Sequence, residues 1–280
     1  MNSTHPMVTP TWLFDHFSDD NVIVLDATTI DAVAGEALQG ARRYLPNSQA
    51  FDIEKVFVDL DNPLPNTMPS PEKFTQQAQT LGINQDSIVV IYDERGLYSA
   101  PRAWWMFQCM GHAQVYVLNG GVNAWQAMGY PITDTHGVDL FAKGNFVAKY
   151  QAEKVYSAQD VLAVMDKLKT LIVDVRGEGR FNGTMQEPRE GMRSGHIPSS
   201  INLPFGKVLV GHQYLPSQEL TALLREYHFD QADKLIFSCG SGLTACIVLL
   251  AAYSAGYTNL ALYDGSWSEW GADHSLPISQ

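Results

Sequence analysis

Cysteine, long apolar runs and positive charge are all scarce in this sequence. Its three cysteines, Cys109, Cys239 and Cys246, are odd in number and fit no disulfide framework, which predicts a reducing, cytoplasmic location. No apolar stretch approaches the roughly 18 residues that a membrane span needs. The first residues lack the basic start and apolar core of a secretory signal. We therefore expect a cytoplasmic protein without a membrane partner.

Basic residues are outnumbered by acidic ones. The chain has 18 Lys and Arg against 30 Asp and Glu, a formal net charge of -12, so neither nucleic acid nor an anionic membrane surface is an expected partner. The basic residues are nevertheless unevenly placed, because four arginines crowd one short segment: Arg176, Arg180, Arg189 and Arg193. We interpret this cluster as a site for a small anion.

Four landmarks occur twice in the chain, which indicates a tandem duplication. Each recurs 145 to 152 residues later, and the pairs are residues 22–26 and 171–174, 44–48 and 196–200, 88–93 and 235–239, and 117–125 and 262–270. Each copy alternates short apolar strands with helical stretches, so we expect an α/β fold of two tandem domains, each a mainly parallel sheet flanked by helices. The predicted boundaries are 1–135, a linker at 136–151, and 152–280.

The second copy delivers one cysteine to a glycine-rich loop. Residues 235–237 predict a buried strand, and an apolar helical pattern follows the loop and ends at Gly256. The loop, from Cys239 through Gly240, Ser241, Gly242, Leu243 and Thr244, can curl so that its N–H groups point inward. Those donors and the following helix favour negative charge. We therefore expect Cys239 to be a thiolate nucleophile at neutral pH.

The first copy has an aspartate where the second has the cysteine. Asp93 cannot act as a sulfur nucleophile, so we expect this copy to be non-catalytic. We expect it to close one wall of a cleft, lined by Asp93, Glu94 and Tyr44, since ligand pockets often lie between domains.

Other nucleophile chemistries fit this loop poorly. A cysteine phosphatase usually has arginine six positions after the cysteine, and that position is Ala245. The histidines at 196, 212 and 228 are too widely spaced for a zinc pattern, and no phosphate-binding glycine motif for a nucleotide occurs. We predict neither a metal nor an organic cofactor.

Together these residues resemble the two-domain rhodanese family, over nearly the whole chain. The loop Cys239-Gly240-Ser241-Gly242-Leu243-Thr244 is similar to that of the 3-mercaptopyruvate sulfurtransferase type, whereas thiosulfate-preferring members typically carry Arg and Lys directly after the cysteine. Further matching segments are residues 92–94, 99–105, 179–181, 187–189, 195–198 and 262–270.

The resemblance implies an enzyme, a transferase that moves sulfur from 3-mercaptopyruvate through a cysteine persulfide. Cys239 would carry the sulfur, the loop residues 240–244 would hold it, and Arg180 and Arg189 would bind the donor. A guanidinium fork can hold the carboxylate and carbonyl oxygens of this keto acid. The expected partners are a small anionic sulfur donor and a thiol acceptor such as a thioredoxin-like protein, or cyanide, with pyruvate released.

Two alternatives stay open: a thiosulfate:cyanide sulfurtransferase, and a persulfide carrier that hands sulfur to a protein partner. The sequence also departs from the family at Tyr44. The resemblance implies a histidine there, which in some members works with the loop serine and an aspartate in proton transfer. A phenol is a poor base at neutral pH, so the proton-transfer residue stays open.

Overall fold

Two compact units make up the chain. The computed structural model describes residues 5–30, 38, 40–137 and 142–280. One unit comprises residues 1–59, 68–151 and 211–213, and the other comprises 60–67, 152–210 and 214–280. Each unit therefore includes a short segment from the opposite half of the sequence, which a boundary drawn along the sequence does not reveal.

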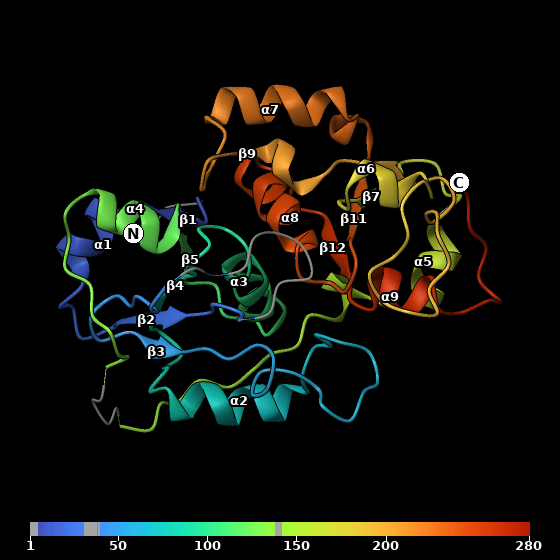
Figure 1. Ribbon diagram of the computed structural model, residues 1–280. Coiled ribbons are helices and arrows are strands. Elements are labelled where there is room, and N and C mark those ends of the chain that lie inside the picture. Colours follow the sequence, from blue (N-terminus) through green and yellow to red (C-terminus); the bar gives the residue numbers. More distant parts are fainter. Residues whose placement is uncertain (1–4, 31–37, 39, 138–141) are drawn as a thin grey trace. The chain divides into compact units, whose positions relative to one another are not determined.

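A five-stranded parallel sheet forms the centre of the first unit, in the order β1-β5-β4-β2-β3. Its strands are β1 (Met7–Val8), β2 (Val22–Asp26), β3 (Gln49–Ala50), β4 (Ile88–Tyr92) and β5 (Val115–Leu118). Its helices are α1 (Pro10–His16), α2 (Pro71–Thr80), α3 (Ala100–Cys109) and α4 (Gly121–Ala127). The helices lie on both sides of the sheet (Figure 1).

The second unit repeats this topology, in the order β6-β12-β11-β7-β8, again with parallel pairing. Its sheet strands are β6 (Val155–Tyr156), β7 (Thr170–Asp174), β8 (Ile201–Asn202), β11 (Lys234–Ser238) and β12 (Leu260–Tyr263). Its helices are α5 (Ala158–Val164), α6 (Glu178–Phe181), α7 (Ser217–Glu226), α8 (Ala245–Ser254) and α9 (Ser266–Trp270). The prediction of two α/β domains with parallel sheets is confirmed.

Shorter elements complete the description. A small sheet pairs β9 (Leu209–Val210) with β10 (Gln213–Tyr214), and three 3-10 turns are η1 (Ala152–Lys154), η2 (Phe205–Val208) and η3 (Phe229–Gln231).

Local sequence explains where several helices begin and end. Thr9 and Ser70 cap α1 and α2 through side-chain oxygens, and each is followed by a proline, which suits a first helical position. Ser157 and Asp160 form a capping box at the start of α5. Gly256, with φ +94°, follows the end of α8, because a left-handed residue stops a helix at little cost when it is glycine.

Apolar side chains cover both faces of the first sheet. Leu13 of α1 and Trp125 of α4 pack with Val90 on one face. The rings of Phe74 in α2 and Phe107 in α3 contact edge to face, with their centroids 5.0 Å apart, in a separate aromatic group. In the second unit, α5 and α9 similarly cover one face of the sheet with residues that include Val161, Trp267 and Trp270.

The middle strand of each sheet ends at the position that the sequence singles out. β4 stops immediately before Asp93, and β11 stops immediately before Cys239. In parallel sheets the carboxyl ends of neighbouring strands share one edge, where ligands bind. The fold therefore puts both residues at equivalent points.

Gly121, which begins α4, offers a test of how tightly the first loop is packed. It has φ +54°, and a Cβ there would lie 2.2 Å from the Asp93 carbonyl oxygen. We expect Gly121→Ala to lower the free energy of unfolding by about 2 kcal/mol more than Gly129→Ala, measured by urea denaturation. Gly129 is the matched control because it also has a positive φ, +76°, but faces open space. Equal losses would refute the close packing.

Candidate active site

Cys239 lies where β11 gives way to the loop that leads into α8. The side chain is 1% exposed, and Ser241 is 8% exposed. Gly242 adopts φ +75°, which reverses the chain direction between the strand and the helix. The ten-residue α8 then follows, with eight of its residues buried. The loop is thus held between a central strand and a core helix.

Main-chain N–H groups at the start of α9 bind the carbonyl groups of the loop. The N–H of Trp267 donates to the carbonyl of Cys239 at 3.0 Å, and the N–H of Ser268 donates to the carbonyl of Gly240 at 2.8 Å. Ser268 Oγ donates to the same Gly240 oxygen at 2.6 Å. Because these carbonyls are bound to α9, they face away from the interior of the loop.

Ser266 takes up two of the loop N–H groups. Its Oγ accepts from the N–H of Cys239 and of Gly242, each at 3.1 Å, and donates to the carbonyl of Tyr263 at 2.9 Å. The expectation that all N–H groups of residues 240–244 face a bound anion is therefore wrong for Gly242. For Gly240, Ser241, Leu243 and Thr244, no protein acceptor of the N–H occurs within the described ranges.

Arg180 reaches the loop from α6. Glu187 accepts from its Nε at 3.1 Å and from its Nη2 at 2.5 Å, so one edge of the guanidinium is held. The Nη1–Nη2 edge faces Gly240, where a Cβ would lie 3.2 Å from Nη2. Glycine at position 240 therefore gives this edge access to the loop.

Arg189 is linked to Gly240 by hydrogen bonds through the side chain of Ser268. Its Nη1 donates to Ser268 Oγ at 2.8 Å, and that oxygen donates to the Gly240 carbonyl. Burial lowers the pKa of Arg189, the Cys239 side chain opposes this change, and the positive charge of Arg180 adds to it. The structure thus brings the two predicted arginines to the cysteine loop.

A buried ion-pair network supports Arg180. Glu187 also accepts from Arg176 Nη1 at 2.8 Å, and Arg176 donates to Asp174 from Nη2 at 2.6 Å. The Arg176 guanidinium lies 4.2 Å from the ring centroid of Trp267. The side chains of Arg176 and Glu187 are each 1% exposed, so removing either would leave an unpaired buried charge. Arg176 is thus structural rather than part of the anion site.

In the first copy, the equivalent loop follows β4, and its N–H groups bind the side chain of Asp93. Asp93 Oδ2 accepts from the N–H of Tyr98, Ser99 and Ala100 at 2.8–2.9 Å, and Oδ1 accepts from the N–H of Arg95 at 2.9 Å. Burial raises the pKa of Asp93, while these four bonds oppose the rise by favouring the carboxylate. The loop is a cradle for one negative atom, and its own aspartate occupies it.

Bond counting relates Asp93 to the chemistry expected at Cys239. A carboxylate oxygen of aspartate lies two bonds beyond Cβ, through Cγ. The outer sulfur of a cysteine persulfide also lies two bonds beyond Cβ, through Sγ. The oxygen that the first loop holds is therefore as many bonds from Cβ as the outer sulfur of a persulfide on Cys239 would be.

The predicted cleft-wall residues are engaged within the first unit. Asp93 is fully buried in its own loop, so its side chain lines no wall, and that prediction is wrong. Glu94 is 4% exposed and accepts from Arg42 Nε at 2.7 Å and Arg43 Nε at 3.1 Å. Tyr44 pairs with Thr133, as His196 pairs with Ser279 in the second unit. Tyr44 thus occupies the position equivalent to His196.

The side chain that contacts the loop serine comes from a segment that sequence reasoning missed. Asn66 Nδ2 donates to Ser241 Oγ at 3.0 Å and to the Ser241 carbonyl at 3.2 Å. Asn66 belongs to residues 60–67, the part of the first half that clusters with the second unit. A polar residue among prolines was the only sequence signal, and it is a weak one.

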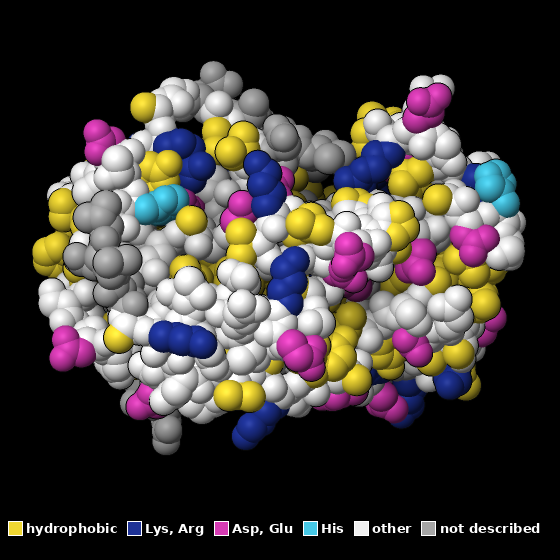
Figure 2. Space-filling view, turned by 90° about the horizontal axis from the view of Figure 1, so that it is seen from below, with side chains coloured by type: hydrophobic (Ala, Val, Ile, Leu, Met, Phe, Trp, Pro, Cys, Tyr) yellow, Lys and Arg dark blue, Asp and Glu magenta, His cyan; other side chains and the backbone are white. Residues whose placement is uncertain are grey.

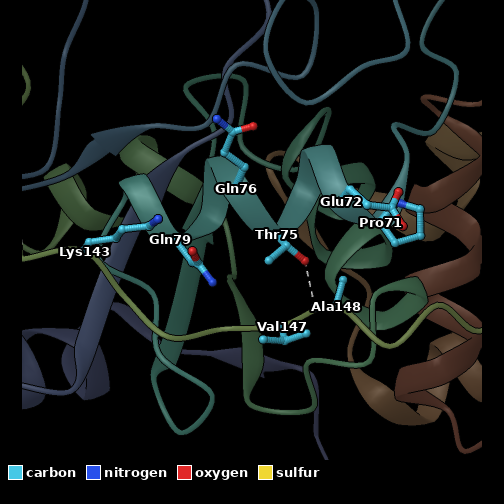
Figure 3. A pocket seen from close by; sticks show the side chains of 8 residues that line it. All are labelled: Pro71, Glu72, Thr75, Gln76, Gln79, Lys143, Val147 and Ala148. Atoms are coloured by element: carbon cyan, nitrogen blue, oxygen red, sulfur yellow. Dashed lines mark hydrogen bonds between the residues drawn. The ribbon is translucent and has the colours of Figure 1, made fainter.

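A second hollow of the described surface lies in the first unit. A pocket between α2 and residues 143–148 is lined by Glu72, Lys143 and amide side chains, and Thr75 accepts there from the Ala148 N–H at 2.9 Å (Figure 3). Figure 2 shows Lys and Arg dispersed among acidic and apolar side chains on one face. Within the described ranges no cluster of three or more His, Cys, Asp or Glu could bind a metal, and no helix could cross a membrane.

Comparison with known proteins gives a consistent assignment. The model of the rhodanese-like domain matches residues 9–128 and 157–273. A 3-mercaptopyruvate sulfurtransferase of Escherichia coli (strain K12) is 37% identical over 99% of this chain and 98% of its own. A thiosulfate sulfurtransferase of Gallus gallus is 38% identical over 88% and 85%. The crystal structure of SseA from Escherichia coli, described as a 3-mercaptopyruvate sulfotransferase, superposes with a TM-score of 0.79 at 34% identity, covering 95% and 100%.

Replacing the cysteine tests whether the second loop is also an anion cradle. We expect the free energy of unfolding at pH 7 to be about 2 kcal/mol higher for Cys239→Asp than for Cys239→Asn. Urea denaturation measures both values. The two side chains are nearly isosteric, but only the carboxylate can accept from every converging N–H group. An asparagine variant as stable as the aspartate variant would rule out the cradle.

Proposed function

Because the chain belongs to the rhodanese family of sulfurtransferases, we propose that it transfers sulfur from 3-mercaptopyruvate to a thiol acceptor through a persulfide on Cys239, and releases pyruvate. The observation that carries this proposal is the approach of Arg180 and Arg189 to the Cys239 loop. A thiolate beside two guanidinium groups suits a donor with one carboxylate and an adjacent carbonyl.

The first half-reaction moves one sulfur atom to the enzyme. The Cys239 thiolate attacks the sulfur of 3-mercaptopyruvate, an S–S bond forms, and the C–S bond breaks. The electron pair of that bond leaves on pyruvate as its enolate. The thiol proton of the donor, first carried on the outer sulfur, ends on the enolate carbon, directly or through water, to give pyruvate. Arg180 and Arg189 offset the negative charge that develops on the leaving group.

The loop then holds the product of this step. The outer sulfur of the Cys239 persulfide is negatively charged once its proton has left. It would be stabilised by the N–H groups of Gly240, Ser241, Leu243 and Thr244, in the way the Asp93 carboxylate is stabilised in its own loop. The bond count from Cβ supports this placement.

The second half-reaction returns the enzyme to its thiolate. A thiolate acceptor attacks the outer sulfur of the protonated persulfide, its own S–S bond forms, and the enzyme S–S bond breaks with the electron pair on Cys239. Cyanide takes the same sulfur from the persulfide anion to give thiocyanate. A thioredoxin-like protein is the acceptor we expect in the cell. The two steps predict ping-pong kinetics without a metal or organic cofactor.

A thiosulfate:cyanide sulfurtransferase is the second candidate, favoured by the similarity to the Gallus gallus protein. Thiosulfate carries two negative charges, and basic side chains in the loop would bind it well. Residues 240–244 contain none, which favours the singly charged keto acid. A carrier that only passes sulfur to a protein would have little need for two substrate arginines. Comparison of kcat/KM for the two donors decides between the enzymes.

A reducing compartment suits this chemistry, and we expect the cytosol. The three cysteines are buried and form no disulfide within the described residues: Cys109, Cys239 and Cys246. Cys246 contacts the Gly242 carbonyl at 3.6 Å, inside the helix that follows the loop. It is a packing residue in this proposal, and only Cys239 is used as the nucleophile.

Mass spectrometry of the intact protein tests the nucleophile. After 3-mercaptopyruvate is added without an acceptor, we expect the wild-type protein to gain the mass of one sulfur atom and to release one equivalent of pyruvate. Cys239→Ser should do neither, while Cys246→Ser should retain both. A wild-type protein that gains no sulfur, or a Cys239→Ser variant that turns over, contradicts the mechanism.

Arginine variants test donor binding. Arg180→Ala should lower kcat/KM for 3-mercaptopyruvate by about 100-fold, because a charge-assisted pair of hydrogen bonds is lost. The loss should be much smaller with inorganic polysulfide, a donor that has no carboxylate. Arg225→Ala, at an exposed arginine of α7, is the matched control and should leave both values near wild type. Equal losses with both donors would argue against carboxylate binding by Arg180.

A further inference from the structure

The contact between Asn66 and Ser241 leads to an inference that rests on the proposed function and adds a residue to it. We infer that Asn66 is a positioning residue, which fixes the Ser241 hydroxyl as a hydrogen-bond donor toward the leaving group of the sulfur donor. Asn66 and Ser241 are 175 residues apart in the sequence, yet the Asn66 amide makes two hydrogen bonds to Ser241.

The two contacts determine which end of the Asn66 amide faces the loop. The main-chain carbonyl of Ser241 can only accept a hydrogen bond. The Asn66 atom 3.2 Å from it must therefore be the NH2 nitrogen, which has hydrogens to donate. The same nitrogen lies 3.0 Å from Ser241 Oγ. An amide nitrogen does not accept, so Ser241 Oγ is the acceptor in that second bond.

This polarity decides where the hydroxyl proton of Ser241 can point. The proton cannot be directed at Asn66, because only a donor faces it there. Within the described part of the chain, no protein acceptor for Ser241 Oγ is found. Ser241 is in the loop beside Cys239 and is 8% exposed. The proton is thus available to an oxygen of the bound donor.

The backbone conformation at position 66 favours asparagine. Asn66 has φ +59°, a left-handed conformation that asparagine and glycine tolerate best. The preceding turn is fixed by the Leu64 N–H, which donates to Asn62 Oδ1 at 3.0 Å, and by Thr67 Oγ1, which donates to the Leu64 carbonyl at 2.8 Å. Of the two tolerant residues, only asparagine supplies the amide.

The Ser241 hydroxyl serves the reaction without giving up its proton. As the C–S bond of 3-mercaptopyruvate breaks, negative charge develops on the carbonyl oxygen of the leaving enolate. A hydrogen bond from a preorganised hydroxyl strengthens as that charge grows and lowers the barrier. Transfer of the sulfur from Cys239 to an acceptor involves no enolate. Asn66 should therefore affect the first half-reaction and not the second.

Two variants that tolerate the left-handed backbone provide the test. Asn66→Gly removes the amide, and should slow persulfide formation from 3-mercaptopyruvate about tenfold. Discharge of the persulfide to cyanide should keep its wild-type rate. Both rates are measured by rapid mixing with detection of pyruvate and thiocyanate. Equal slowing of both half-reactions would indicate a disturbed loop and overturn the inference.

Asn66→Asp gives a pH signature that loss of packing would not. Above the pKa of the introduced carboxyl group, its oxygens accept rather than donate, so they draw the Ser241 proton away from the donor. Persulfide formation should then be slower than in Asn66→Gly, and it should recover, relative to wild type, as the pH falls and the carboxyl is protonated. A ratio to wild type that is independent of pH overturns the inference.

A double variant shows whether Asn66 acts through Ser241. If it does, Asn66→Gly should cause no further loss of rate in a Ser241→Ala background. Additive losses overturn the inference. These outcomes are separable from the proposed function, because wild-type protein that gains no sulfur from 3-mercaptopyruvate refutes that function first. Wild-type loading with unaltered Asn66 variants refutes only the role of Asn66.

Discussion

The structure depends on the main-chain N–H groups of the loop that follows the central strand of each sheet. Such groups must be satisfied when buried, and a negatively charged atom satisfies several of them at once. In the first unit the Asp93 carboxylate is that atom. In the second, the shorter and buried side chain of Cys239 stands at the equivalent point, and under the proposed function an accepted sulfur would extend it. The same demand of the backbone is thus met by a permanent structural bond in the first copy, and under the proposed function it would be met by the persulfide in the second.

The two copies also differ at the next residue, which is Glu94 after Asp93 and Gly240 after Cys239. In the first unit Glu94 is buried and forms ion pairs with Arg42 and Arg43. In the second unit Gly240 leaves room for the guanidinium of Arg180, a contact that a Cβ would crowd. Under the proposed function, the aspartate-to-cysteine difference would supply the nucleophile, and this second difference would give Arg180 access to the loop.

Much of this was predictable, because it is local in the sequence. Short apolar runs that recur in both halves of the sequence predicted the central strands. The same duplication identified Asp93 as the counterpart of Cys239. The remaining site groups depend on contacts between distant segments. Asn66 reaches the loop over 175 residues, and Ser266 reaches it over 24 to 27. No periodicity reports such hydrogen bonds, so Gly242 was wrongly expected to offer its N–H to the anion.

Ser266 shows that the second copy retains a backbone cost that the first copy avoids. It adopts φ +51°, while its counterpart Gly121 adopts φ +54° with no Cβ to strain. A left-handed serine costs about 1 kcal/mol relative to glycine. Its hydroxyl, however, binds the N–H groups of Cys239 and Gly242, which are otherwise buried without a partner. The strain is therefore offset by two hydrogen bonds, which tie the N–H groups of Cys239 and Gly242 to one oxygen and so fix the curve of the loop.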